Sequence, residues 1–262
     1  MSLPFFKYQA LGNDFVVVEL SEVMTAELAR RLCHRRRGIG ADGVLSVLPP
    51  RGPGAAYLHI YNSDGSVAAM CGNGIRCVAR HLAERRGLSG DISIETDCGV
   101  KRCLVHRGGA GKVEAVSVEM GPARFDGEEL FEVAGESLRG QRISMGNPHV
   151  VFFEEPSRER AARLGPLIER AVPGGVNVGF AALRDGVLGL VVHERGAGLT
   201  DACGTGACAA VAAAVKSGLL GAGRTVEVEL PGGSLDIAVD ADLSGVLMRG
   251  PAERSFQGVF EL

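Results

Sequence analysis

One short cysteine motif occurs twice in this chain, about half a chain length apart. Residues 71–77 read Cys-Gly-Asn-Gly-Ile-Arg-Cys and residues 203–208 read Cys-Gly-Thr-Gly-Ala-Cys, so the leading cysteines are 132 positions apart. A second pair of similar segments, 12–18 and 146–152, repeats at an offset of 134. Self-similarity at a nearly fixed offset indicates a duplicated structural unit. We therefore expect two halves related by a pseudo-twofold axis, which can present their motifs to each other across a cleft.

The duplication also predicts the domain organisation. A chain of 262 residues is long enough for two domains of about 130 residues each. Met120-Gly121-Pro122 is a turn signal at the midpoint, and Gly250-Pro251 closes the later half. We predict one domain from residues 1–120 together with 252–262, which return to it as a strand, and a second domain from residues 121–251.

Composition excludes several classes of partner. The net charge of −3 indicates no basic field for nucleic acid. No apolar stretch reaches the roughly 18 residues needed to span a membrane, and the first residues lack the pattern of a signal peptide. Seven cysteines are an odd number, typical of thiols in a reducing compartment and not of a disulfide framework. We expect a cytoplasmic protein with neither a nucleic-acid nor a membrane partner.

Strand-like and helical segments alternate along the chain, which predicts a mixed α/β (α+β) fold. The runs bounded by turn residues are 15–19, 44–48, 57–61, 91–96, 113–119, 150–154, 189–193, 225–230, 235–239 and 245–248. Helices are expected over 25–36, with Thr25 as N-cap, and over 75–86 and 207–215. The last of these has no polar face, which is typical of a helix buried on all sides. We therefore place it, and by the repeat its counterpart, at the centre of a sheet.

Each repeated motif combines a cysteine with the start of a helix. The glycines that follow Cys71 and Cys203 let the backbone approach a ligand closely. The N–H groups of a first helical turn bind a carboxylate and also stabilise a thiolate. One short segment therefore supplies both an anion cradle and a tunable acid or base.

Two such motifs facing each other suit inversion of an amino acid at its α-carbon. One cysteine, as thiolate, would remove the α-proton, and the other, as thiol, would deliver a proton to the opposite face. The backbone groups available to stabilise charge on the α-carboxylate belong to Gly72, Asn73, Gly204 and Thr205. Because the two sulfurs would be coupled, their pKa values belong to the pair.

Two other interpretations of the cysteines remain open at this stage. Cys71, Cys77, Cys203 and Cys208 could bind zinc, although their spacings depart from the usual C-x2–4-C pattern. A redox disulfide between Cys71 and Cys203 is chemically possible, although the chain has no C-x-x-C motif. Cys77 and Cys208 themselves fall inside expected helices, where a small buried side chain is the usual interpretation.

The chain resembles the diaminopimelate epimerase family over almost its whole length. The segments that carry the resemblance are F-x-K-Y-Q-A-L-G-N-D-F at 5–15, R-G-I-G-A-D-G-V-L at 37–45, Y-N-S-D-G-S-x-A-A-M-C-G-N-G-I-R-C at 61–77, G-N-P-H at 146–149 and E-R-G-A-G-L-T-D-A-C-G-T-G-A-C at 194–208. They occur in the family's order. The resemblance implies two pseudo-symmetric domains, each a barrel-like, mostly antiparallel sheet around a central helix, usually in a homodimer.

The resemblance also implies an activity. It predicts an isomerase that needs neither PLP nor any other cofactor nor a metal, and that interconverts LL- and meso-diaminopimelate for lysine and peptidoglycan precursors. The acid–base pair falls on Cys71 and Cys203, and the α-carboxylate cradle falls on Gly72-Asn73 and Gly204-Thr205. The residues implied for the distal end of the substrate, for lining the site, or for tuning the cysteines are Asn13, Asn62, Asn147, His149, Asn177, Glu194 and Arg195.

The chemistry of the distal set agrees with a substrate that carries a second carboxylate and a second amine. Arg195 offers a bidentate fork for a carboxylate, and Glu194 offers a charge for an ammonium or a cysteine. The asparagines both donate and accept hydrogen bonds. Taken singly, Asn62 and Asn147 are also plausible turn residues. Asn62 and Glu194 each precede their cysteine by nine residues, which favours equivalent places in the two halves.

Three positions depart from the family's usual pattern. Gly43 stands where some members have Gln, Gly179 where Glu is common, and His193 where Trp or Tyr is common. We expect Gly43 and His193 to touch or adjoin the pocket, which affects substrate preference. The alternative function is another PLP-independent, two-cysteine amino acid racemase; Arg195 argues for a substrate with a distal carboxylate. Isomerases of the phenazine-biosynthesis type lack the cysteine pair.

Overall fold

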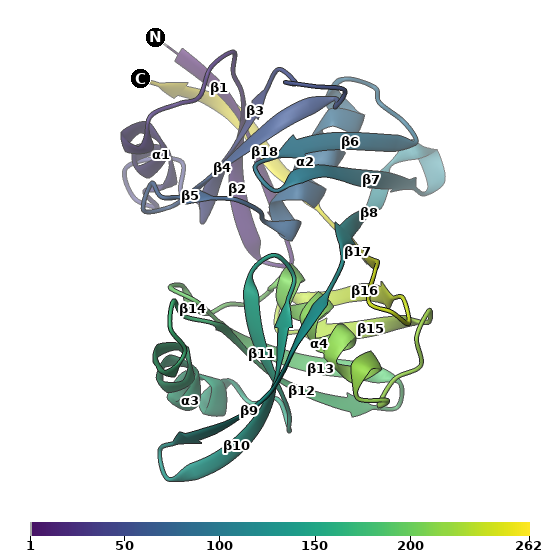
Figure 1. Ribbon diagram of the computed structural model, residues 1–262. Helices are drawn as coiled ribbons and strands as arrows, with labels where there is room; N and C mark the ends of the chain where they lie inside the picture. Colours follow the sequence, from purple (N-terminus) through teal and green to yellow (C-terminus); the bar gives the residue numbers. More distant parts are fainter. Residues whose placement is uncertain (1) are drawn as a thin grey trace. The chain divides into compact units, whose positions relative to one another are not determined.

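The computed structural model describes residues 2–262 as two compact units (Figure 1). The first unit runs to Val118 and also includes Gly250–Leu262, and the second is Glu119–Arg249. The chain thus leaves the first unit once and returns to it once. Because each unit has its own set of strands and its own pair of helices, each is described separately.

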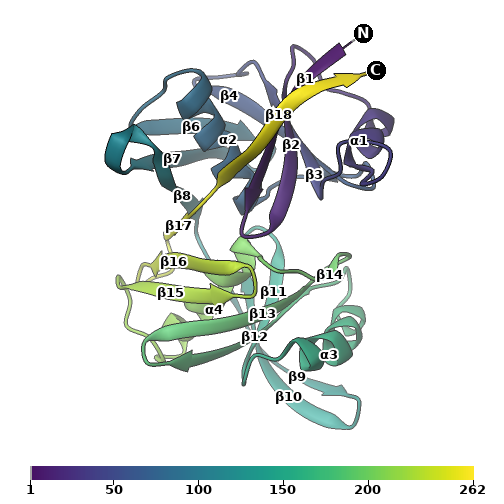
Figure 2. The ribbon, with the colours of Figure 1, turned by 180° about the vertical axis from the view of Figure 1, so that it is seen from behind.

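The sheet of the first unit combines both ends of the chain. Its strands, in order across the sheet, are β18 (Glu253–Glu261), β1 (Ser2–Ala10), β2 (Asn13–Glu19), β3 (Gly43–Leu48), β4 (Ala56–Asn62), β6 (Asp91–Thr96), β7 (Gly99–Arg107) and β8 (Val113–Gly121). The pairs β2–β3 and β4–β6 are parallel and the others antiparallel. Short β5 (Val67–Ala68) adds to β4, and a 3-10 turn (Gly109–Gly111) precedes β8. Figure 2 shows β18 lying along β1.

The sheet of the second unit has the same order and the same strand directions. Its strands are β9 (Arg124–Val133), β10 (Glu136–Ser144), β11 (Pro148–Phe153), β12 (Asn177–Arg184), β13 (Val187–Glu194), β15 (Thr225–Leu230), β16 (Gly233–Val239) and β17 (Val246–Gly250). Again only the third and fifth pairings, β11–β12 and β13–β15, are parallel. Short β14 (Gly198–Leu199) adds to β13. The expected mixed fold of two similar, mostly antiparallel halves is confirmed.

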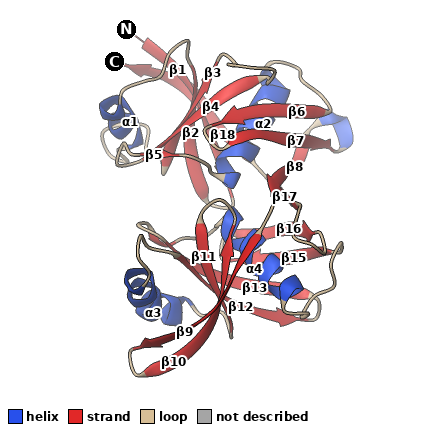
Figure 3. Cartoon of the chain, in the orientation of Figure 1, coloured by secondary structure: helices blue, strands red, loops and turns tan. Residues whose placement is uncertain are grey.

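A buried helix lies against the inner face of each sheet (Figure 3). In the first unit α2 (Gly72–Arg85) contacts β1, β2, β3, β6, β7 and β18, and in the second α4 (Gly204–Lys216) contacts β10 to β13 and β16. Every α4 residue from Gly204 to Ala214 is buried, which confirms the prediction from its lack of a polar face. Helix α2 is buried as completely from Gly72 to Ala83, although it carries charged residues.

The outer face of each sheet is covered by a second helix. Helix α1 (Ala26–Cys33) packs on β3 and β4, and α3 (Arg158–Ala171) packs on β12 and β13. Thr25 caps α1 by accepting from the Leu28 N–H at 3.2 Å, as predicted. The prediction that this helix continues to residue 36 is wrong, because it ends at Cys33.

The sequence-based assignment omitted α3, the strands β1, β7, β9, β10 and β12, and the short strands β5 and β14. Helix α3 buries only the narrow stripe Ala161, Leu164, Gly165 and Ile168 and contains Pro166, so its apolar period is weak. Strands β9 and β10 bury few side chains, so they lack the apolar alternation that indicates a strand.

Candidate active site

Cys71 is the N-cap of the first buried helix. It has extended backbone angles (φ −145°, ψ 112°), and its sulfur accepts the N–H of Gly74 at 3.5 Å. A cap in this place satisfies one of the N–H groups that a first helical turn leaves without an intrahelical acceptor. Gly74 is required by packing, since a Cβ there would lie 2.9 Å from Leu45 on β3. The sheet therefore packs directly against the turn that carries Cys71.

Cys203 occupies the same place at the start of the second buried helix. Its backbone is also extended (φ −125°, ψ 102°), and its sulfur accepts the N–H of Gly206 at 3.4 Å. A Cβ at Gly206 would lie 3.0 Å from Val192 on β13. Cys203 is buried, whereas Cys71 is partly exposed. The repeated motif thus produces the same cap twice, with different access to solvent.

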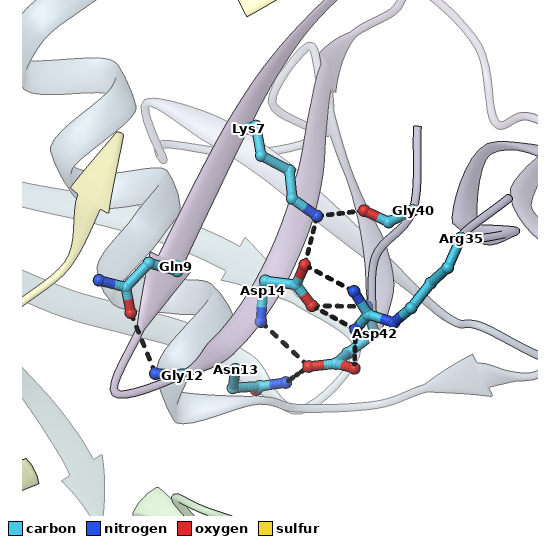
Figure 4. A network of polar contacts seen from close by, with 8 residues as sticks. All are labelled: Lys7, Gln9, Gly12, Asn13, Asp14, Arg35, Gly40 and Asp42. Carbon is cyan, nitrogen blue, oxygen red and sulfur yellow. Dashed lines mark hydrogen bonds and ion pairs between the residues drawn. The ribbon is translucent and has the colours of Figure 1, made fainter. Parts of the chain in front are cut away.

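In the first unit, two asparagine side chains lie beside the cysteine. Asn13 Oδ1 is 4.0 Å from Cys71 Sγ and accepts from Asn73 Nδ2 at 3.2 Å. Asn13 Nδ2 donates to Asp42 Oδ2 at 2.8 Å, and Arg35 holds the other Asp42 oxygen (Figure 4). Asn13 starts β2 and Asp42 precedes β3, so parallel pairing of these two strands brings the two residues together.

In the second unit, Asn147 takes the place of Asn13. Its Nδ2 is 3.2 Å from Thr205 Oγ1, and Thr205 Oγ1 is 3.7 Å from Cys203 Sγ. The Oδ1 of Asn147 is 3.1 Å from His149 Nε2. The two kinds of repeated segment therefore meet within each unit: the segment that contains Gly-Asn lies against the cysteine motif of the same half.

Three further expected site residues form one cluster at the carboxyl end of β13. Asn177 Oδ1 accepts from the backbone N–H of Arg195 at 3.0 Å, and its Nδ2 donates to the Pro148 carbonyl at 2.9 Å. The Arg195 guanidinium is exposed and donates to the Gly174 carbonyl at 3.2 Å. Glu194, which precedes Arg195 in the chain, accepts a hydrogen bond from Thr200 Oγ1 at 2.6 Å. Asn177 thus holds the turn from which Arg195 extends.

Asn62 occupies the equivalent place in the first unit. It ends β4 as Glu194 ends β13, in agreement with their equal spacing from the two cysteines. Its side chain is exposed and donates to Ser66 Oγ at 2.9 Å. This hydrogen bond lies within the turn that follows β4, so Asn62 stabilises that turn. Its expected role in binding the substrate stays a prediction.

Burial determines the protonation state of Cys203. Desolvation raises the pKa of the Cys203 thiol well above its ordinary value, and the nearby Glu194 charge raises it further. Burial also raises the pKa of the Glu194 carboxyl, against the opposing hydrogen bonds from Thr200 and Cys203. Cys203 is therefore a thiol at neutral pH in the free protein, the form that can donate a proton.

His149 is a neutral imidazole at neutral pH. Burial lowers its pKa to about 3, and the positive charge of Arg195 acts in the same direction. A neutral histidine carries one N–H and one bare nitrogen, so it can orient the Asn147 amide without adding charge to the site.

This burial predicts a measurable loss of stability in acid. The unfolded chain protonates His149 near pH 6.5 and the folded chain only near pH 3. The unfolded state therefore binds more protons between these values, and the free energy of unfolding falls as pH drops below 6.5, by up to about 1.4 kcal/mol per pH unit from this group. Urea unfolding of His149→Gln should show a shallower pH dependence than the wild type over this range. Equal slopes would contradict the assignment.

Two departures from the family pattern acquire structural explanations. The His193 ring lies against Gly165 of α3, where a Cβ would come within 2.5 Å, and its Nε2 is 2.9 Å from Glu169. Successive side chains of a strand point to opposite faces, so His193 points away from the face of Glu194. At Gly43, a Cβ would lie 2.5 Å from the Tyr61 carbonyl, so this backbone accepts only glycine there.

Sequence reasoning missed two residues of the first unit, Asp42 and Arg76. Arg76 is completely buried, and its Nη2 donates to Asn73 Oδ1 at 2.8 Å. Its Nε donates to the carbonyl of Pro251, in the segment that returns to this unit. The sequence could have indicated both residues, because they lie inside the motifs 37–45 and 61–77 that carry the family resemblance. A charged residue beside a glycine-rich turn needs a hydrogen-bond or ion-pair partner when it is buried.

The structure describes two other features relevant to function. Across residues 2–262, no helix has both the length and the apolar character needed to cross a membrane. In the same range, His, Cys, Asp and Glu side chains form no cluster suited to holding a metal ion.

Two solved structures share this fold. A probable proline racemase from Agrobacterium radiobacter matches with a TM-score of 0.80 at 19% identity, over 99% of this chain and 92% of that one. A phenazine biosynthesis protein of the PhzF family from Bacillus anthracis also has a TM-score of 0.80, at 16% identity and over 100% of both chains. The chain therefore has the fold that the probable proline racemase and the PhzF-family protein share.

Sequence comparison identifies the family. The diaminopimelate epimerase family model matches residues 5–125 and 142–255. Diaminopimelate epimerases from Cyanothece sp. and Moorella thermoacetica are each 41% identical, over 99% and 98% of this chain and 100% and 99% of their own. The chain belongs to the diaminopimelate epimerase family.

Proposed function

We propose that the protein interconverts LL- and meso-diaminopimelate by moving a proton between two cysteines. One observation carries the proposal: each of two equivalent units places a cysteine as N-cap of a buried helix, Cys71 on α2 and Cys203 on α4. The 41% identity to diaminopimelate epimerases supports the substrate. The domains expected from the sequence, residues 1–120 with 252–262 and residues 121–251, would each carry one cysteine.

The reaction is written with the two sulfurs on opposite faces of the α-carbon. In the direction that starts from a Cys71 thiolate, Cys71 takes the α-proton while the Cys203 thiol gives its proton to the other face. The C–H bond breaks on one side and a new C–H bond forms on the other, so the stereocentre inverts and the cysteines exchange protonation states. The raised pKa of Cys203 supports its role as the proton donor in this direction.

The helix starts stabilise the charge that develops on the α-carboxylate. The backbone N–H groups of Gly72-Asn73 and Gly204-Thr205 lie in the first turns, at the positive ends of the two helix dipoles. Both turns are held by sheet packing at Gly74 and Gly206, so the groups are in place before the reaction begins, as electrostatic stabilisation of a transition state requires.

The distal end of the substrate is assigned to the polar residues outside the cysteine turns. Arg195 supplies a fork for the second carboxylate, and Asn177 holds its backbone. The further residues assigned to this end or to lining the site are Asn13, Asn62 and Asn147. His149 orients Asn147, and Glu194 acts on Cys203. A single amino acid without a distal carboxylate would leave Arg195 unused.

The remaining assignments follow from the resemblance. We propose that the enzyme works without a cofactor, in the cytoplasm, as a homodimer, and that its product enters lysine and peptidoglycan precursor synthesis. Size measurement in solution by light scattering tests the dimer independently of the activity.

Solvent exchange tests the reaction directly. Freshly reduced protein in D2O with LL-diaminopimelate, without PLP or metal, should give the meso isomer with deuterium at the inverted α-carbon. Proton NMR follows the exchange and chiral chromatography the stereoisomers. No exchange with confirmed free thiols would reject diaminopimelate as substrate and direct attention to single amino acids.

A further inference from the structure

A chain of side-chain hydrogen bonds crosses the start of α2, from an anion to a cation. It consists of Asp42, Asn13, Asn73 and Arg76, which we name the first-unit relay. Asn13 Nδ2 donates to Asp42 at 2.8 Å, Asn73 Nδ2 donates to Asn13 Oδ1 at 3.2 Å, and Arg76 donates to Asn73 Oδ1 at 2.8 Å. Cys71 Sγ lies 4.0 Å from the central oxygen, Asn13 Oδ1.

The charged ends determine the direction of every bond in this relay. An ionised carboxylate only accepts and a guanidinium only donates, so Asp42 must face the NH2 of Asn13, and Arg76 must face the oxygen of Asn73. The two amides in between then have one consistent orientation. Further contacts hold both ends: Asp42 is bound by Arg35 and by the Asp14 N–H (Figure 4), and Arg76 by the Pro251 carbonyl.

The corresponding contacts of the second unit lack this constraint. There the path runs from His149 through Asn147 and Thr205 to Cys203. His149 is neutral and can present either an N–H or a bare nitrogen, and a hydroxyl can donate or accept. This path is consistent with either orientation of the Asn147 amide. The position that matches Arg76 in the repeat is Cys208, so the second unit has no cation there.

We propose that Asp42 is a positioning residue that keeps the carbonyl oxygen of Asn13 directed at the Cys71 sulfur, with Arg76 fixing the other end of the relay. An oxygen acceptor beside the sulfur favours the S–H form, which donates to it, and disfavours the thiolate. The relay thus lowers the fraction of Cys71 that is a thiolate in the free protein, compared with a helix cap that has no such oxygen beside it. The relevance of this inference to catalysis rests on the proposed acid–base role of Cys71. The experiment that tests it does not depend on that role.

Asp42 is the end of the relay to change, because its side chain is 44% exposed whereas Arg76 is completely buried. In Asp42→Asn the new amide can also donate, so only the Asn73–Arg76 end still favours the present orientation of Asn13, and in a fraction of the molecules Asn13 turns its NH2 toward Cys71. In Asp42→Glu the group remains an acceptor only. Asp126→Asn makes the same charge change at a surface carboxylate that pairs with Arg124, and serves as the matched control.

The test measures alkylation of Cys71 by iodoacetamide at fixed pH, resolved by mass spectrometry of the peptide that contains it. We expect Asp42→Asn to react about fivefold faster at Cys71, the effect of one hydrogen bond, with Asp42→Glu and Asp126→Asn close to the wild type. Alkylation of Cys203, measured in the same samples, should not change.

Two outcomes would overturn the proposal. An unchanged Cys71 rate in Asp42→Asn would show that the amide orientation does not govern the sulfur. An equal acceleration in Asp42→Asn and Asp42→Glu would show loosened packing instead of amide polarity. Neither readout uses diaminopimelate, so a failure here is distinguishable from a failure of the proposed reaction.

Discussion

Replacing either Cys71 or Cys203 with serine should lower kcat for inversion by about 10²- to 10⁴-fold, the usual contribution of a positioned acid or base. A serine hydroxyl caps the helix equally well but is far less acidic than a thiol. The loss should therefore be chemical, with little change in the midpoint of thermal unfolding. Chiral chromatography of the stereoisomers measures the loss.

The control for this experiment is Cys98→Ser, which changes an exposed cysteine outside both helix caps and should retain wild-type turnover. Exchange in D2O adds a sharper readout. With one cysteine left, a substrate isomer can still exchange its α-proton at the face of that sulfur, while inversion is lost. Near-normal inversion in either serine variant would remove the two-base mechanism.

Replacing Arg195 with alanine should lower kcat/KM for diaminopimelate by about 100-fold, since it removes charge-assisted hydrogen bonds to the distal carboxylate. The backbone of the turn should remain in place, because Asn177 holds the N–H of residue 195 and not its side chain. Initial rates over a range of substrate concentrations give the effect on KM and kcat separately.

Arg184→Ala is the matched control, because Arg184 is a surface arginine paired with Glu155 at the far end of β12. We expect its kcat/KM to equal that of the wild type. Arg195→Lys should fall between the wild type and alanine, because an ammonium keeps the charge but loses the bidentate geometry. If Arg195→Ala leaves kcat/KM unchanged, the distal carboxylate is bound elsewhere.

The two cysteine sites are alike in backbone and different in electrostatics. Cys203 is buried beside a carboxyl, Glu194, whereas Cys71 is partly exposed beside the relay that ends at Arg76. The duplicated motif thus produces the same helix cap twice, and the neighbouring residues give the two cysteines different burial and different charged neighbours.

Local sequence determined the parts of this protein that depend on neighbours in the chain. The cysteine caps, the helices behind them and the strands 91–96 and 225–230 follow from residue spacing, because a helix cap or an alternating strand needs only nearby residues. The repeat likewise indicated two similar halves. The buried α4 was predictable because thirteen residues with almost no polar side chain cannot be exposed.

Tertiary structure alone decided which polar groups meet. Asp42 reaches Asn13 only because β2 and β3 pair in parallel, and Arg76 can be buried in α2 only because the chain returns at Pro251 with a carbonyl to receive it. His193 faces α3 because Gly165 leaves room for its ring. Buried polar groups need partners, and those partners come from segments far away in the chain, which no local pattern specifies.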